Sequence, residues 1–283
     1  MLQKIRERGM HLLFFLSAGV SIAAVLLICI FLFSRGIPAI HEIGVQEFLL
    51  GKVWKPSSDL YGIFPMIIGS LYVTAGAIAV GVPIGLLTAI FLAFFCPGRI
   101  YRFLKPAVDL LAGIPSVVYG FFGLMVIVPF IRNTFGGSGT SWLAASLVLG
   151  IMILPTVIGV SEAALRAVPK SYYEGSLALG ATHERSVFRT MLPAAGSGVL
   201  SAIILGVGRA VGETMAVIMV AGNQAVMPSS LTKGLRTLTA NIVLEMGYAT
   251  DLHREALIAT AVVLFVFVLL INLSFSAVKR RKG

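Results

Sequence analysis

The chain has 283 residues, of which 58% are hydrophobic and 12% charged, and its mean hydropathy is +0.96. Globular domains carry about 25% charged residues, so this composition excludes an ordinary soluble domain. The formal net charge is +10, but basic loops are expected of a membrane protein, so the excess does not indicate nucleic-acid binding. Two cysteines, Cys29 and Cys96, are too few for a disulfide framework or a zinc site.

Six apolar runs predict six membrane-spanning helices. About 20 apolar residues, each rising 1.5 Å, cross the hydrocarbon of a bilayer. The runs cover about 12–33, 66–95, 110–131, 142–160, 199–220 and 256–278. Runs of this length favour helices over the shorter strands of a barrel. We therefore expect an all-α membrane protein with a single transmembrane domain over residues 1–283.

The first run follows a basic leader, Lys4, Arg6 and Arg8, as the apolar part of a signal peptide would. The run is longer than that part of a signal peptide, and no A-x-A cleavage site follows it. We therefore expect a retained membrane span.

The distribution of Lys and Arg predicts the orientation. Fourteen of them lie in the N-terminus, the loops after the second and fourth runs, and the C-terminus with its basic tail Lys279–Lys282; seven lie on the opposite side. Cytoplasmic loops carry the excess of Lys and Arg, so both termini are expected in the cytoplasm.

Signatures of catalysis are missing from the sequence. It contains no G-x-x-x-x-G-K-[ST], H-E-x-x-H or G-x-S-x-G motif. The four histidines, His11, His41, His183 and His253, are scattered, and we expect each to be solvated or interfacial. We therefore expect no catalytic residues, no metal and no cofactor in this chain, which leaves transport or scaffolding.

Pro115 lies inside the third run. A proline within a helix removes one hydrogen bond and frees a carbonyl one turn back. We expect a kinked helix in which Ser116 or water satisfies that carbonyl. The kink would serve either helix packing or the wall or gate of a pathway.

The loop predicted over residues 161–198 carries the most specific pattern. From Glu174 it reads EGSLALGATHERSVFRTMLPAA. This resembles the E-A-A-x3-G-x9-I-x-L-P motif of ABC-importer permeases, whose short helix docks in a cleft of the ATPase subunit. The matching positions are Glu174, Gly180, Leu192 and Pro193, while Gly175, Ser176 and Thr190 depart from the motif.

Local chemistry agrees with this register. Gly180 is expected to break the helix and Pro193 to start the next one. The literal Glu162-Ala163-Ala164 upstream does not fit, because it would put Val168 at the glycine position. An ordinary amphipathic helix on the membrane surface is the alternative.

The fifth run contains two charges, Arg209 and Glu213. A charged group near the bilayer centre is costly unless it is paired or hydrated, and an i, i+4 spacing places both groups on one helix face. The two residues form either an ion pair that locks the helix into the bundle or an anion route. In that route Arg209 attracts the anion and Glu213 tempers its affinity, because conduction requires weak binding.

The whole chain resembles the permease subunits of the bacterial phosphate ABC importer. The matching segments are 61–65, 112–120, the Glu174 loop and 208–214. The runs 215–217 and 221–223 and the segment 54–56 resemble the PstC member, although the related PstA member shares the third-helix and Arg/Glu motifs. In this family the Arg/Glu pair has been tied to phosphate passage.

The resemblance implies a type I ABC-importer permease in the bacterial inner membrane. Its partners would be a second, PstA-like permease, two copies of a cytosolic ATPase and a periplasmic phosphate-binding protein. The alternatives are the PstA role itself, a permease for sulfate, molybdate or phosphonate, an ion-coupled secondary transporter, and a non-transporting assembly subunit. Residues 39–60 and 227–255, with a short helix at Leu238–Met246, are expected to face the binding protein.

Overall fold

The computed structural model describes the backbone of residues 2–282 and the side chains of residues 7, 9–274 and 277. The side chains of the predicted anchors Lys4, Arg6, Arg8 and Lys279–Lys282 lie outside this part. The helices are α1 (Leu2–Ile43), α2 (Val45–Leu50), α3 (Phe64–Ile90), α4 (Gly98–Gly113), α5 (Ser116–Phe122), α6 (Val128–Phe135), α7 (Trp142–Ala167), α8 (Lys170–Ala178), α9 (His183–Ser186), α10 (Leu192–Ala194), α11 (Gly196–Gly212), α12 (Met215–Val220), α13 (Leu238–Glu245) and α14 (Asp251–Lys282).

Shorter elements join these helices. The two-residue strands β1 (Trp54–Lys55) and β2 (Leu60–Tyr61) pair antiparallel, with Trp54 opposite Tyr61, around the 3₁₀ turn η1 (Pro56–Ser58). There are also three π-helical turns: η2 (Phe91–Phe95) ends the helix that begins with α3, while η3 (Gly123–Ile127) and η4 (Val187–Met191) each lie between two helical segments.

Five helical segments are long and apolar enough to cross a bilayer within the described residues: Gly9–Ile43, Phe64–Phe95, Ser116–Phe135, Trp142–Ala167 and Asp251–Ser274. A sixth is obtained when His183–Ala194 and Gly196–Gly212, which are bent by 70° relative to each other, are counted as one span. The expected all-helical membrane architecture is therefore confirmed.

The centre of the bundle is the close contact of α3 and α7, against which α11 packs. Glycines allow this approach. A Cβ on Gly76 would lie 2.2 Å from Ser146 Oγ, and one on Gly81 would lie 2.7 Å from the carbonyl oxygen of Gly150. The core around this contact consists of fully buried aliphatic side chains, such as Leu149 and Ile153 of α7.

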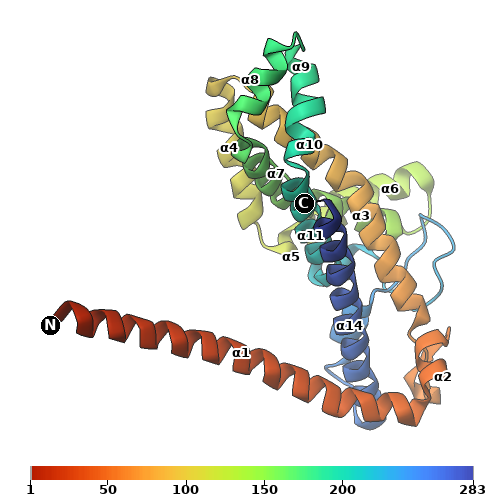
Figure 1. The fold of residues 1–283 in the computed structure, drawn as a ribbon. Coiled ribbons are helices and arrows are strands. Elements are labelled where there is room, and N and C mark those ends of the chain that lie inside the picture. The colour runs from red at the N-terminus through yellow and green to blue at the C-terminus, as the bar shows by residue number, and fades with distance from the viewer. Residues whose placement is uncertain (1, 283) are drawn as a thin grey trace.

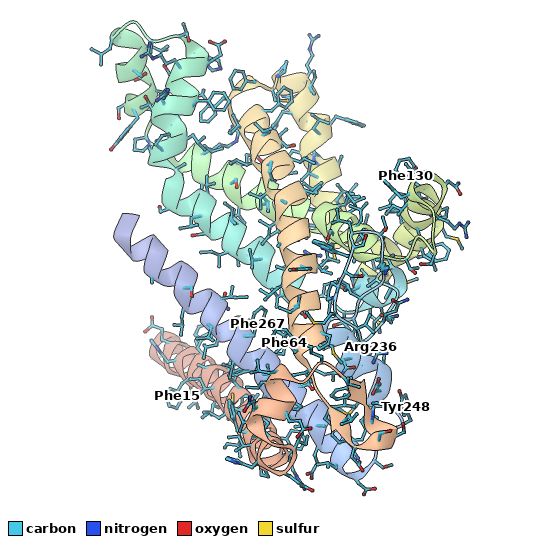
Figure 2. The ribbon with its side chains drawn as sticks, turned by 90° about the vertical axis from the view of Figure 1, so that its right-hand side faces the viewer. Phe15, Phe64, Phe130, Arg236, Tyr248 and Phe267 are labelled. Carbon is cyan, nitrogen blue, oxygen red and sulfur yellow. The ribbon has the colours of Figure 1, made fainter. Side chains whose placement is uncertain are left out.

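α1 pairs with α14 along its C-terminal part, where Gly36 lies against Val262. The rest of α1 extends away from the bundle (Figure 1). Most of its large apolar side chains between Met10 and Ile28 are exposed. Segment α8–α10 lies at one end of the bundle, and Arg236 and Tyr248 lie at the opposite end (Figures 1 and 2). We call these the α8 end and the α13 end.

The third apolar run does not form the single kinked helix that we predicted over 110–131. Helix α4 ends at Gly113, Ile114 and Pro115 are extended, and α5 starts at Ser116. The carbonyl oxygen of Leu111, which Pro115 leaves without its usual partner, accepts a hydrogen bond from the Tyr119 hydroxyl at 2.7 Å. Tyr119 therefore takes the role that we assigned to Ser116 or water.

The predicted loop 161–198 begins later, because α7 continues to Ala167. Ser161, Glu162 and Leu165 are buried, so packing keeps this segment helical beyond the apolar run. Pro193 does not start a new helix either. It lies inside α10, directly after the wide turn η4, and the bend comes at Ala195. A π turn spaces the backbone more widely and so accommodates a residue without an N–H.

Candidate functional site

Arg209 and Glu213 do not form the ion pair that their spacing predicted. α11 ends at Gly212, and Glu213 is extended, with a ψ of 131°. The i, i+4 geometry holds only within a continuous helix, so the break separates the two side chains. Among the described side chains, no carboxylate lies within ion-pair distance of Arg209.

Both residues have other partners. Arg209 Nη1 donates a long hydrogen bond of 3.5 Å to the Thr156 hydroxyl of α7. Glu213 Oε1 accepts a hydrogen bond from the Ala216 N–H at 3.1 Å. Glu213 thus satisfies one of the free amide groups at the start of α12, where the helix dipole also favours a negative charge. The arrangement leaves a partly buried cation beside a break in the helix.

The α8 end contains the segment that resembles the ATPase-coupling motif. α8 is largely exposed, including Glu174 and Gly175, and it ends in a turn at Gly180, whose φ is +83°. A positive φ is strained for residues with a side chain, so the expected helix break at Gly180 is confirmed. A Cβ on Gly175 would meet nothing within 4 Å, so packing does not require the departure from alanine there.

The other two departures from the motif, Ser176 and Thr190, bond to each other. Thr190 Oγ1 donates to Ser176 Oγ at 3.4 Å, and Ser176 Oγ lies 3.0 Å from Ser186 Oγ. Ser186 donates its own proton to the carbonyl oxygen of Thr182 at 2.9 Å, so Ser176 must donate to Ser186. This hydroxyl chain ties α8 to α9 and η4.

An open groove of about 690 Å³ lies beside this chain. It is lined by Ser171, Tyr172, Gly175, Ser176, Leu179, Gly180, Ala181, Arg185 and Thr190. Leu179 is 91% exposed, which is unusual for a leucine away from lipid. Glu174 faces a second cavity of about 440 Å³, between α8, η2 and the end of α7. Leu192 is half-buried and Pro193 is exposed.

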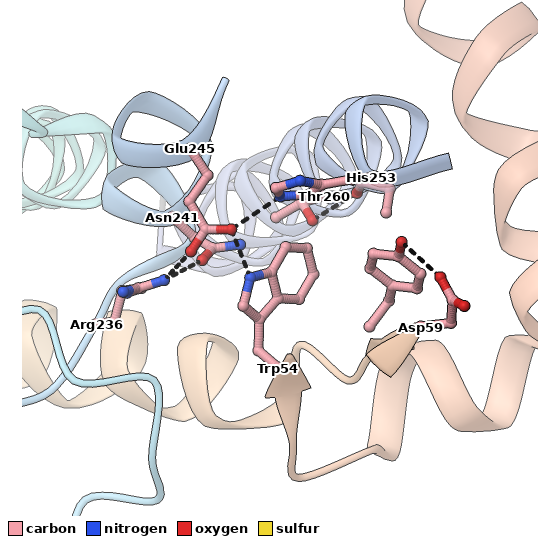
Figure 3. A network of polar contacts seen from close by, with 9 residues as sticks. Trp54, Asp59, Arg236, Asn241, Glu245, His253 and Thr260 are labelled. Atoms are coloured by element: carbon pink, nitrogen blue, oxygen red, sulfur yellow. Dashed lines mark hydrogen bonds and ion pairs between the residues drawn. The ribbon is translucent and has the colours of Figure 1, made fainter. Parts of the chain in front are cut away.

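The sequence did not reveal the polar cluster at the α13 end, which Figure 3 shows. It is built around Glu245, which accepts hydrogen bonds from Trp54 Nε1 at 2.8 Å and from Arg236 Nη1. His253 Nε2 lies 2.9 Å from the same carboxylate, and Arg236 also donates to Asn241 Oδ1 at 2.9 Å. Of the two positions that we expected for His253, solvated or interfacial, the solvated one is wrong, because the side chain is only 14% exposed. The segments 54–61 and 236–253, both predicted to be external, form one unit.

A second cluster lies at the α8 end, around Glu162 of α7. Its Oε1 accepts hydrogen bonds from the Tyr101 hydroxyl and from Arg166 Nε, both at 2.8 Å. Lys105 Nζ lies 3.5 Å from Oε2 and 2.9 Å from Asp109 Oδ1. The hydrogen bond to Glu162, helped by burial, raises the pKa of Tyr101, so its hydroxyl remains a donor. The cluster fixes α4 on α7, and Arg166 also reaches the Leu92 carbonyl of η2.

Comparison with known proteins identifies the family. Residues 81–283 match the family described as binding-protein-dependent transport system inner membrane component. The chain belongs to this family. It is therefore a multi-pass inner-membrane permease component, and the family implies work with a substrate-binding protein, an ATPase and a second permease subunit.

Relatives support this membership over most of the permease. It is 42% identical to the probable ABC transporter permease protein YqgH of Bacillus subtilis, over 90% of this chain and 86% of the relative. It is 34% identical to the phosphate transport system permease protein PstC of Mesorhizobium japonicum, over 86% of this chain and 81% of the relative. It is 30% identical to the probable phosphate transport system permease protein PstC of Methanocaldococcus jannaschii, over 86% of this chain and 84% of the relative.

Solved structures show the same fold. The permease resembles a chain of the inward-facing MetNI methionine ABC transporter with a TM-score of 0.64 and 23% identity, over 82% of this chain and 100% of that one. It resembles a chain of a bacterial alginate ABC transporter, in complex with a pentasaccharide-bound periplasmic protein, with a TM-score of 0.64 and 15% identity, over 94% of both. The expected type I ABC-importer permease fold is thus confirmed.

Proposed function

We propose that this permease is the PstC-type subunit of an importer that moves inorganic phosphate across the inner membrane. Several relatives that are 30% to 34% identical are named as phosphate transport permeases. The observation that carries the proposal is Arg209, a partly buried guanidinium in a spanning segment that lacks a carboxylate partner among the described side chains. A buried cation without a counter-ion attracts an anion strongly.

Glu213 has an indirect role in this proposal. Its side chain caps α12 and so holds the break that leaves Arg209 accessible. The hydrogen bond that Arg209 donates to Thr156 is long, so an oxyanion that accepts shorter, charge-assisted hydrogen bonds from Arg209 could displace Thr156. Conduction requires release of the anion as well as capture, and a single guanidinium suits this requirement better than a site that binds the anion tightly.

The α8 end would face the cytoplasm and bind the ATPase. In this proposal Glu174, Gly175, Gly180, Leu192 and Pro193 belong to the coupling segment, and the groove beside α8 receives the ATPase surface. ATP hydrolysis belongs to that separate subunit, present in two copies. A PstA-like permease completes the pathway, and a periplasmic phosphate-binding protein docks at the α13 end. ATP and the docked binding protein drive alternating access because each binds one state more tightly.

The test is uptake of labelled phosphate into proteoliposomes that contain this chain and its co-expressed partners, with and without enclosed ATP. We expect ATP-dependent uptake that excess sulfate leaves unchanged. Uptake that sulfate, molybdate or phosphonate suppresses would indicate that the competing anion is the substrate, and uptake that does not depend on ATP would favour an ion-coupled secondary transporter. If no flux is observed, the chain would be interpreted as a non-transporting assembly subunit.

In the same assay, Arg209→Gln should reduce phosphate uptake by at least about tenfold, the loss expected when a charge-assisted hydrogen bond to the anion is removed. The complex should still assemble. Arg132→Gln is the matched control, because Arg132 is exposed at the end of α6. Uptake by Arg209→Gln equal to that of the control would remove Arg209 from the pathway.

A further inference from the structure

A hydrogen bond ties the short helix α13 to the break between α11 and α12. Thr239 Oγ1 donates to the carbonyl oxygen of Glu213 at 3.1 Å. Glu213 is the extended residue at which the helix is interrupted, and it lies four positions after Arg209. The bond therefore joins a segment at the α13 end directly to the backbone beside the proposed pathway.

The same hydroxyl belongs to the cap of α13. Thr237 Oγ1 accepts a hydrogen bond from the Ala240 N–H at 3.2 Å and lies 3.1 Å from Thr239 Oγ1. Thr239 has one hydroxyl proton, which it gives to Glu213, so Thr237 must donate to Thr239. Both threonines are buried. The start of α13 and the break in the spanning helix are thus parts of one hydrogen-bonded chain.

α13 is held firmly by its other contacts. Its first residue, Leu238, donates its N–H to Ser70 Oγ of α3 at 3.0 Å. At its other end Glu245 holds Trp54, Arg236 and His253 in the cluster of Figure 3. We call the segments 54–61 and 236–253 the outer cap. Because the cap is braced as a unit, a displacement at its surface would move α13 as a rigid piece.

We propose that Thr239 is a positioning residue through which the outer cap sets the geometry of the Glu213 break. When the cap shifts, the bond moves the Glu213 carbonyl and with it the end of α11 that carries Arg209. The bonded segment gives the pathway a physical link to the surface where a binding protein docks. This inference rests on the proposed function, since it concerns a transport cycle.

The experiment compares Thr239→Val, which replaces the hydroxyl by a methyl group of similar size, with two other variants in the reconstituted complex. Thr239→Ser keeps the hydroxyl. Thr260→Val is the matched control, because Thr260 is also buried but bonds only within its own helix, to the Ala256 carbonyl. One readout is the ratio of ATP hydrolysis with and without the phosphate-loaded binding protein. The other is hydrogen–deuterium exchange of the amides of residues 214–217.

Thr239→Val should lower the stimulation ratio about three- to tenfold, in line with the loss of one buried hydrogen bond. It should also accelerate exchange at 214–217. Thr239→Ser and Thr260→Val should behave like the wild type in both measurements. A purely structural role of the hydroxyl would change exchange or yield without changing the ratio.

The proposal would be overturned by an unchanged ratio in Thr239→Val, an equal loss in Thr260→Val, or no rescue by Thr239→Ser. Thr239→Ala is measured in parallel, since it removes the hydroxyl without adding a methyl group in its place. If neither Thr239→Val nor Thr239→Ala assembles with the ATPase, the hydroxyl serves assembly and the positioning role is wrong. Failure of the proposed function is separate, because it would show as a wild-type complex that phosphate-loaded binding protein does not stimulate.

Discussion

The two ends of the bundle are each organised around one buried carboxylate, but the basic side chains beside these carboxylates differ in exposure. Glu245 contacts Arg236 and His253 at the α13 end, and Glu162 contacts Lys105 and Arg166 at the α8 end; each carboxylate also accepts a hydrogen bond from an aromatic side chain. The side chains of Arg236 and His253 are 17% and 14% exposed, whereas those of Lys105 and Arg166 are 26% and 46% exposed. Water can replace a lost partner only where it reaches the charge. The α13 end is therefore rigid and the α8 end more tolerant of rearrangement.

Glu245→Gln tests this difference at the end with the less exposed basic side chains and should have the largest effect. The amide cannot neutralise Arg236, so a buried charge is left without compensation, at a cost of about 3 to 5 kcal/mol in the free energy of unfolding. Thermal unfolding of the purified permease complex measures the loss. Glu255→Gln is the control, since Glu255 forms an exposed, long ion pair with Arg35 at 3.7 Å. Equal melting temperatures of the two variants would contradict the rigid α13 end.

Glu162→Gln should have a smaller effect, about 1 to 2 kcal/mol, because solvent reaches Lys105 and Arg166. Lys105 also keeps Asp109 as a partner. The pKa of Lys105 is raised, since Asp109 and Glu162 together outweigh the burial that acts against its charge. The same thermal unfolding measures the change, with Asp109→Asn as the exposed control. A loss greater than that of Glu245→Gln would reverse the comparison.

The hydroxyl chain at the α8 end should give the smallest effect. Thr190→Val and Ser176→Ala should each cost about 0.5 to 1.5 kcal/mol, because each leaves a polar partner unsatisfied. The double variant should cost less than the sum, since it removes both members of the bond. A double-mutant cycle in thermal unfolding measures this coupling. Strict additivity would show that the bond between Ser176 and Thr190 contributes nothing.

The apolar spanning segments and the turn at Gly180 could be predicted from the sequence, because both depend on local properties; the expected six spans are reached when the bent pair is counted as one. Hydrophobic length determines what can cross a bilayer, and a glycine tolerates a positive φ wherever a helix ends. The short helix near 238–246 was also predicted, and α13 confirms it. The exact helix ends were less predictable, since packing keeps α7 helical to Ala167.

The breaks and the clusters were not predictable, because their partners are distant in the chain. Trp54 and Glu245 are 191 residues apart, and Tyr101 and Glu162 are 61 apart. The pairing of Arg209 with Glu213 failed because it assumed a continuous helix through Gly212. The link between Ser176 and Thr190 did leave a signal in the sequence, because these hydroxyl residues stand at the two positions where the motif has the apolar residues alanine and isoleucine.

Two of the three π-helical turns, η3 and η4, set the phase of the helical residues that follow them, whereas η2 ends its helix at Phe95. Each turn accommodates one residue more than a regular α-helical turn. Removing a single residue there would restore the regular turn and rotate every following side chain by about 100° about the helix axis. Side chains downstream would then turn away from the lipid-facing or buried positions that they now occupy.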